Sequence, residues 1–292
     1  MSASEETLYW LARRLYPTEI AHSQSMKEAL IDRRKHEEFR AGQADRVVAA
    51  ARRYGVALAG REVVDLGCND GSLTHQYLKE GVRRITGVDI DAEAIAIARA
   101  RGADPRIDFA VSATGRIPLA DESVDTIVCF DVFEHVADPG ALLGECRRIL
   151  RPSGQLLIGT WGWYHPFAPH VWSTLPVPWA QVFFSERTIL RTCRRVFHSD
   201  WYVPTIHEVD AQGNKRTDRF LNETISRDYL NKYLIRDFER AFEQSGMAWQ
   251  VHLEPFGSKY ARWSRVLLGV PWLREFIASY FWAVIEKPGK PA

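Results

Sequence analysis

The strongest constraint on the fold is a regular alternation of short apolar strands with helices in the middle of the chain. Five segments rich in β-branched residues predict strands: 62–67, 84–90, 106–111, 124–130 and the second half of 151–160. The segments 72–81, 91–102 and 141–150 have the spacing of helices, and Asp91 is a good N-cap for the second of them. Strands and helices that alternate at this spacing predict a doubly wound parallel sheet with helices on both faces.

The alternation is lost after residue 160 and resumes near the C-terminus. Residues 161–225 are rich in tryptophan and proline and predict an irregular lid. A helix at 233–246 and strands at 247–256 and 278–287 then complete the pattern. We therefore expect a helical N-terminal cap over 1–58 and a domain over 59–292, with insertions at about 162–225 and 257–277.

Charge and cysteine content exclude several classes of protein. The formal net charge of +1 over 292 residues gives no global electrostatic attraction to nucleic acid, so we expect no nucleic-acid partner. The four cysteines are far apart and include no C-x-x-C pair, which favours a reducing, cytoplasmic setting. The longest apolar region, 266–287, is interrupted by Pro271, Arg274 and Glu275, so we expect no stable membrane insertion.

The turn after the first strand, "EVVDLGCNDGSL", is a candidate ligand site because ligands of such sheets bind at the carboxyl ends of strands. A dinucleotide turn needs glycines where Asn69 and Ser72 stand, and a phosphate loop needs a lysine that is missing. The pattern acidic-x-G-x-G-x-G nearly fits through Asp65, Gly67 and Gly71, with Asn69 at the middle glycine. Asparagine is tolerated there because it can adopt the left-handed conformation.

This turn resembles the class I S-adenosylmethionine-dependent methyltransferases, and three further motifs agree in order and spacing. They are "GVDIDAEAIAIARA", "VSATGRIPLADESVDTIVCFDVFEHVADP" and "RILRPSGQLLIGT". The resemblance covers about 60–161 and returns more weakly in "NKYLIRDFERAFEQSGM". It implies a Rossmann-like seven-stranded sheet, mostly parallel with an antiparallel last strand, and S-adenosyl-L-methionine as cofactor.

The resemblance also implies roles for individual residues. Asp65 would accept a hydrogen bond from the cofactor ammonium, although it could instead only cap the turn. Asp89 would bind both ribose hydroxyls, and Ile90 would pack on adenine. Ala113 departs from the aspartate that many relatives carry toward adenine. The expected cofactor-binding residues are Asp65, Gly67, Cys68, Asn69, Gly71, Asp89, Ile90, Ser112, Ala113, Thr114, Phe130, Asp131 and His135.

The candidates for chemistry at the methyl acceptor are His165, His170 and Asp131. The two histidines follow the fifth strand, have a suitable pKa range, and could equally serve only as hydrogen-bonding groups within the loop. A metal site made by these three residues is the weaker interpretation, because no metal-ligand spacing recurs, and we expect none. Glu134 and His135 form a pair that is common in the family without being catalytic in most members.

The sequence leaves several functions open. The aromatic residues of 161–184 favour a small apolar, aromatic or sugar-containing acceptor, methylated on oxygen, although the same residues could be ordinary core. Methylation of a macromolecule and a non-catalytic cofactor-binding scaffold are the alternatives. The basic segment 32–40 could contribute one of Arg33, Arg34, His36 or Arg40 to the cofactor carboxylate or remain a solvated helix face. The segment 270–282 could touch a membrane surface or pack the last strand against the lid. The acceptor and the oligomeric state stay undetermined.

Overall fold

A single seven-stranded sheet organises the part of the chain that the structure describes. The computed structural model describes residues 2–18, 23–112, 115–210, 212–218, 220–256 and 261–290. Its strands, in chain order, are β1 (Glu62–Leu66), β2 (Arg84–Asp89), β3 (Ile107–Val111), β4 (Val124–Phe130), β5 (Leu150–Thr160), β6 (Ala248–Pro255) and β7 (Ala278–Glu286). The sheet order is β3-β2-β1-β4-β5-β7-β6, and only β7 runs antiparallel to its neighbours. The predicted fold class is confirmed.

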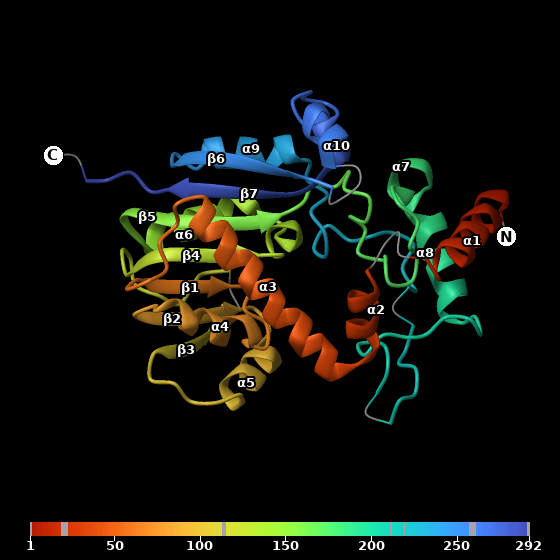
Figure 1. Ribbon diagram of the computed structural model, residues 1–292, viewed down its shortest axis with the longest axis horizontal. Coiled ribbons are helices and arrows are strands. Elements are labelled where there is room, and N and C mark those ends of the chain that lie inside the picture. Colours follow the sequence, from red (N-terminus) through yellow and green to blue (C-terminus); the bar gives the residue numbers. More distant parts are fainter. Residues whose placement is uncertain are drawn as a thin grey trace.

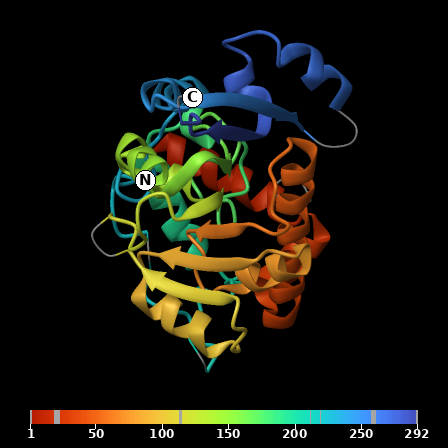
Figure 2. The ribbon, with the colours of Figure 1, turned by 90° about the vertical axis from the view of Figure 1, so that its left-hand side faces the viewer.

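Helices cover both faces of the sheet and also build a separate region beyond the carboxyl ends of the parallel strands (Figure 1). They are α1 (Ala3–Leu15), α2 (Gln24–Ile31), α3 (Arg33–Arg53), α4 (Ser72–Tyr77), α5 (Ala92–Ala100), α6 (Pro139–Ile149), α7 (Ala180–Phe183), α8 (Glu186–Phe197), α9 (Ile235–Gln244), α10 (Ala261–Leu267) and α11 (Arg274–Ile277), with 3₁₀ turns at Leu78–Glu80 and Phe133–His135. Figure 2 shows the twisted strands with α3 along one side.

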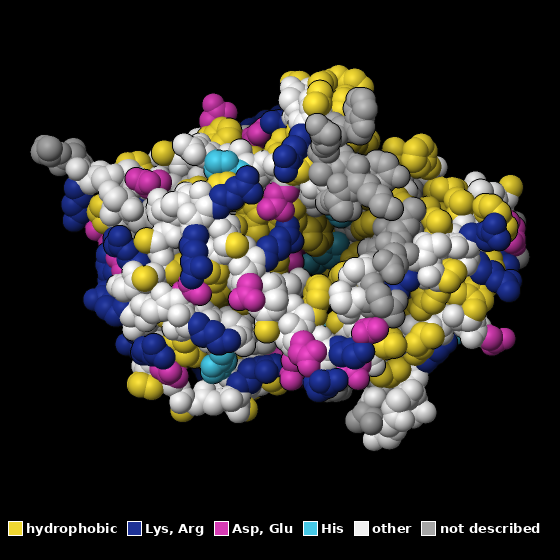
Figure 3. Space-filling model, in the orientation of Figure 1, with side chains coloured by type: hydrophobic (Ala, Val, Ile, Leu, Met, Phe, Trp, Pro, Cys, Tyr) yellow, Lys and Arg dark blue, Asp and Glu magenta, His cyan; other side chains and the backbone are white. Residues whose placement is uncertain are grey.

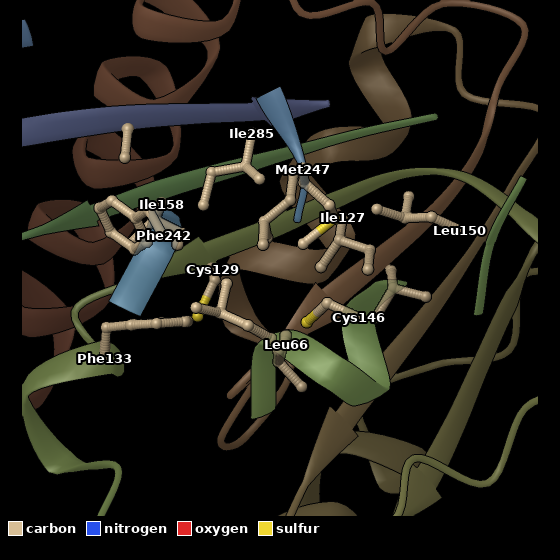
Figure 4. Packing of buried hydrophobic residues seen from close by; sticks show 14 of the residues in the cluster. Leu66, Ile127, Cys129, Phe133, Cys146, Leu150, Ile158, Phe242, Met247 and Ile285 are labelled. Carbon is tan, nitrogen blue, oxygen red and sulfur yellow. The ribbon is translucent and has the colours of Figure 1, made fainter. Parts of the chain in front are cut away.

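The core lies in two layers, one on each face of the sheet. Helices α6 and α9 pack on one face, where Leu66, Ile127 and Cys129 of the sheet meet Cys146 and Phe242 of the helices (Figure 4). Helices α3 and α4 pack on the other face through a second cluster. Because successive strand residues point to opposite faces, strands covered on both sides are mostly apolar, which explains the apolar runs 63–64 in β1 and 127–130 in β4.

The lid differs from the irregular segment that its proline content predicts. It contains a twelve-residue helix, α8, whose Ser185 N-cap accepts a hydrogen bond from the Thr188 amide. The buried side chains of α8 recur at helical spacing and pack with Leu8 and Ala12 of α1. Figure 1 shows α1 and α8 side by side, beyond the carboxyl ends of the parallel strands. The N-terminal helix therefore stabilises the lid.

The segment before β7 packs against the lid and α9. Phe276 stacks on Tyr164 with ring centroids 4.5 Å apart. The buried Glu275 carboxylate accepts hydrogen bonds from the Ile235 and Arg236 amides, the first two of α9. Trp272 is 68 % exposed. None of the helices in the described ranges is long and apolar enough to cross a membrane.

Candidate functional site

The strand order reverses between β1 and β4, and the turns after these two strands lie in contact. Gly67, directly after β1, has φ +78°, and a Cβ atom built on it would lie 2.2 Å from Cγ2 of Val132. A side chain at position 67 is therefore excluded both by backbone conformation and by space. Crevices at such reversals are where doubly wound sheets bind ligands.

The rest of the glycine turn holds the Asp89 carboxylate in place. Asn69 adopts the left-handed conformation with φ +49°, as its substitution for glycine requires. Its amide donates to Oδ2 of Asp89 at 2.8 Å, and the Asp91 amide donates to Oδ1 at 3.0 Å. Gly71 begins α4 with φ +71°, and a Cβ there would lie 2.7 Å from Cζ of Phe109. The turn thus joins the ends of β1 and β2.

Asp65 is a buried carboxylate under this turn. Its Oδ2 accepts a hydrogen bond of 2.5 Å from the Thr74 hydroxyl of α4. Burial raises the pKa of Asp65 to about 6, against the opposing effects of the Thr74 hydrogen bond and the Arg40 guanidinium. Arg40 belongs to α3 and also lowers the pKa of Asp131. The positive charge of Arg40 therefore acts on both buried carboxyl groups.

The other residues expected to bind the cofactor differ in whether their side chains are exposed, buried or already hydrogen-bonded. Ile90 is 76 % exposed, so its side chain leaves an apolar surface open beside Asp89. Cys68 is buried with Ile95 and Phe109, so only its backbone can face a ligand. The Ser112 hydroxyl donates to the Arg116 carbonyl at 2.9 Å. Ala113 and Thr114 lie outside the described residues.

The end of β4 carries a strained aspartate that is bound to β7. Asp131 has φ +54°, and its Oδ1 accepts a hydrogen bond of 2.6 Å from the Tyr280 hydroxyl. Burial raises the pKa of Asp131 to about 6, while the hydrogen bond and Arg46 oppose this shift. Phe130 packs its ring against Tyr280, and the Arg46 guanidinium lies 4.0 Å from the centre of the Tyr280 ring. Strained conformations of this kind concentrate at functional sites.

The lid histidines lie on either side of Trp161, at the end of β5. The His165 ring stacks on Trp161 at 5.4 Å, and its Nδ1 accepts a hydrogen bond from the Phe167 amide. Burial lowers the pKa of His165 to about 4. The His170 ring lies 5.1 Å from Trp161 and 4.8 Å from the His135 ring. The structure therefore brings His170 toward the end of β4.

His135 and its neighbour Glu134 form the base of this region. Nδ1 of His135 donates to the Tyr229 carbonyl at 2.6 Å, and burial lowers the pKa of His135. Glu134 is 4 % exposed, and its Oε2 accepts a hydrogen bond of 2.6 Å from the Thr160 hydroxyl. Burial, with the nearby Asp131 charge, raises the pKa of Glu134 to about 8. Figure 3 shows a hollow in this face of the molecule with histidine side chains at its base.

Glu134 is the functional candidate that sequence reasoning set aside. The signal was its position: Glu134 is the fourth residue after β4, whose last four residues are apolar, and a carboxyl group buried at such a place needs a polar partner. Its partner, Thr160, lies 26 positions along the chain, at the end of the neighbouring β5. Sequence spacing alone gives no sign of that contact.

Comparison with known proteins identifies the same region. Residues 64–158 match the sequence model of a family described as "Methyltransferase domain". A probable S-adenosylmethionine-dependent methyltransferase of Mycolicibacterium smegmatis is 39 % identical over 102 residues, 35 % of this chain and 38 % of that protein. A ubiquinone biosynthesis O-methyltransferase of Xylella fastidiosa is 33 % identical over 109 residues, 36 % of this chain and 44 % of that protein. The matched segment thus spans less than half of these relatives.

Solved structures extend the likeness of fold over most of the chain. An S-adenosylmethionine-dependent methyltransferase from Mesorhizobium loti superposes with a TM-score of 0.50 at 19 % identity, covering 82 % of this chain and 98 % of that one. A Haemonchus contortus phosphoethanolamine N-methyltransferase, in complex with S-adenosylhomocysteine, gives 0.51 at 15 % identity, covering 84 % of this chain and 53 % of that one. The chain is therefore similar in sequence to a methyltransferase domain over residues 64–158, and it shares the fold of these methyltransferases over most of its length.

Proposed function

We propose that this protein binds S-adenosylmethionine at the turns after β1 and β2. We further propose that it transfers the methyl group to a hydroxyl oxygen of a small apolar or aromatic molecule. The matched relatives that are named O-methyltransferases of ubiquinone biosynthesis support an oxygen acceptor. The four cysteines are reduced and buried, and the proposal includes a cytoplasmic setting.

One observation carries the cofactor part of this proposal: Asp89 is fixed by the amide of left-handed Asn69, beside the exposed Ile90. A fixed carboxylate next to an exposed apolar side chain suits a ribose diol joined to a flat base. The amino-acid tail of the cofactor carries an ammonium and a carboxylate. Asp65 and Arg40 offer the two complementary charges at the other end of the turn.

The acceptor would bind where the lid faces the ends of β4, β5 and β7. Trp161 lies between His165, His170 and the Tyr280 ring, with centroid distances of 5.1 to 5.8 Å. Trp179 donates from its indole nitrogen to the Tyr164 carbonyl and so holds the outer part of this wall. Flat aromatic walls of this kind favour flat or apolar acceptors.

Methyl transfer needs the acceptor oxygen, the methyl carbon and the sulfur in line, with water excluded. In our proposal the lid supplies the exclusion, and the Asp131–Tyr280 pair positions polar groups of the acceptor. His165 is the weakest candidate for a general base, because a base with a pKa near 4 holds a proton poorly at neutral pH.

The experiment that tests cofactor placement is calorimetric titration of S-adenosylhomocysteine into wild type and Asp89→Ala. We expect a loss of about 10- to 100-fold in affinity, the range for losing charged hydrogen bonds. Asp108→Ala on the adjoining β3 is the control, since its side chain is 62 % exposed. Unaltered affinity in Asp89→Ala would contradict our placement of the ribose.

The acceptor is tested separately with a panel of phenols, catechols and aliphatic alcohols. Formation of S-adenosylhomocysteine and of the methylated product is measured for wild type and for the double variant His165→Ala, His170→Ala. We expect turnover with an aromatic hydroxyl compound and a large loss in the double variant. Cofactor binding with no turnover of any acceptor would favour the scaffold alternative.

A further inference from the structure

Three potential metal ligands converge where the turn after β4 meets the lid. One ligand atom each of Glu134, His135 and His170 lies within 4.8 Å of the other two. Glu134 and His135 are adjacent in sequence, whereas His170 comes from the lid, beyond β5. We propose that these three side chains bind a divalent transition-metal ion of the zinc class.

The donor set suits such an ion. Two imidazoles and one carboxylate make the set that holds zinc in several hydrolases, with a fourth position left open. Imidazole favours zinc and its neighbours in the first transition row, whereas magnesium favours oxygen ligands alone. The two imidazoles and the carboxylate therefore favour zinc and its neighbours over magnesium.

The carboxylate has one oxygen in use and one available. Oε2 of Glu134 accepts the Thr160 hydrogen bond. Oε1 is buried and makes no hydrogen bond within the described ranges. A buried carboxylate oxygen with no donor is expensive, and a cation beside it removes that expense. This buried oxygen without a donor is a second observation, beside the convergence of the three side chains, that points to a ligand.

The histidines are arranged as metal ligands usually are. His135 donates from Nδ1 to the Tyr229 carbonyl, which fixes its tautomer and leaves Nε2 free to coordinate. The Tyr229 segment is in turn held on the same turn, since the Asn231 side chain donates to the carbonyls of Phe133 and Val136. A second shell of this kind orients a ligand and raises its basicity.

The spacing requires a small contraction. Ligand atoms around a tetrahedral ion at 2.0–2.2 Å lie about 3.4 Å apart, which is less than the 4.8 Å limit of the group. His170 has φ +56° in a loop rather than in a strand or helix. Closing the group therefore needs movement of a loop side chain and leaves the sheet unchanged.

The location gives the ion a role in the proposed reaction. The group adjoins Trp161 at the acceptor side of the site. An ion with open positions there would bind the acceptor hydroxyl and lower its pKa, which would replace a side-chain base. This role rests on the proposed methyl transfer, whereas metal binding itself can be tested without it.

The test uses the full chain, first stripped with a chelator and dialysed. Zn²⁺ binding is measured by competition titration, and Co²⁺ binding by its visible absorption. We expect one ion per chain in wild type. Mutation of residues that only hydrogen-bond to a metal ligand lowers metal affinity about 10- to 100-fold. Because His170 and Glu134 would be ligands themselves, we expect a loss at least as large in His170→Ala and in Glu134→Gln. His165→Ala is the matched control, a lid histidine on the same tryptophan, and should bind as wild type does.

Each outcome decides the proposal. Binding that depends on His170, His135 and Glu134 but not on His165 supports it. Absence of a stoichiometric ion in wild type would overturn it. So would binding by His135→Ala and His170→Ala that is as tight as binding by wild type. Loss in His165→Ala with binding retained in His135→Ala would point instead to the set of His165, His170 and Asp131. Circular dichroism of each metal-free variant separates failure to fold from loss of a ligand. Glutamine at position 134 can still accept the Thr160 hydrogen bond, so Glu134→Gln removes the charge with the least disturbance of the fold.

Discussion

Replacing Asp65 with asparagine should stabilise the cofactor-free protein while weakening cofactor binding. Burial raises the pKa of this carboxyl from 3.8 to about 6. A carboxyl whose pKa is higher in the folded than in the unfolded state favours folding when protonated, and it opposes folding as pH rises through the folded pKa. At pH 8 the ionised group therefore costs about 3 kcal/mol, and at pH 5 about 1.5 kcal/mol. Asparagine lacks this charge and can still accept the Thr74 hydrogen bond.

The assay is thermal and urea unfolding of wild type and Asp65→Asn at pH 5 and pH 8, without cofactor. We expect the variant to gain roughly 5–10 °C at pH 8 and about half of that at pH 5. Asp45→Asn, at an exposed position on α3, is the charge-matched control and should change little. An equal gain at both pH values, or a loss at pH 8, would refute the argument from burial. In parallel, S-adenosylhomocysteine should bind about 10- to 100-fold more weakly to Asp65→Asn.

Three further perturbations test the frame around the site. Gly67→Ala should unfold at a markedly lower temperature than Gly60→Ala, because both glycines have positive φ but only Gly67 lacks space for a Cβ; similar melting temperatures would contradict the predicted clash. Tyr280→Phe should lose about 1.5–3 kcal/mol above pH 6, where Asp131 is ionised, and less at pH 5; urea unfolding at the two pH values measures this, and a pH-independent loss would argue against a charged partner. Glu275→Ala should cost about 2 kcal/mol by chemical denaturation, since it leaves the first two amides of α9 unpaired; an unchanged midpoint would show that another group takes its place.

Local sequence was sufficient for the elements of the sheet. The predicted strand at 124–130 coincides with β4, and the strand predicted at 84–90 differs from β2 by one residue. These segments are covered on both faces, so their composition is constrained at every position. Helix α8 was not predicted from the sequence, because the prolines before it are typical of irregular structure. Ser185 and the apolar spacing after it are nevertheless signals of a helix.

In the site, contacts at the ends of neighbouring strands could be predicted from sequence, whereas contacts between turns that are far apart in sequence could not. Gly67, Asn69 and Asp89 follow strands whose ends must meet at one edge, so a strand pattern is enough to predict that they lie together. The contacts of Glu134 with Thr160, and of His135 with His170, join turns that no periodicity relates.

The sequence by itself determined the alternation of strands and helices, the glycine turn and the carboxylate at the end of β2. Each depends on steric limits and burial within a few residues. Only the tertiary structure decided that α1 packs on the lid, that the Arg40 charge lowers the pKa of Asp65, and that Glu134 shares its surroundings with a lid histidine. Those contacts depend on how the lid folds back over the sheet, and that path is set by the sum of many weak packing interactions that no single motif encodes.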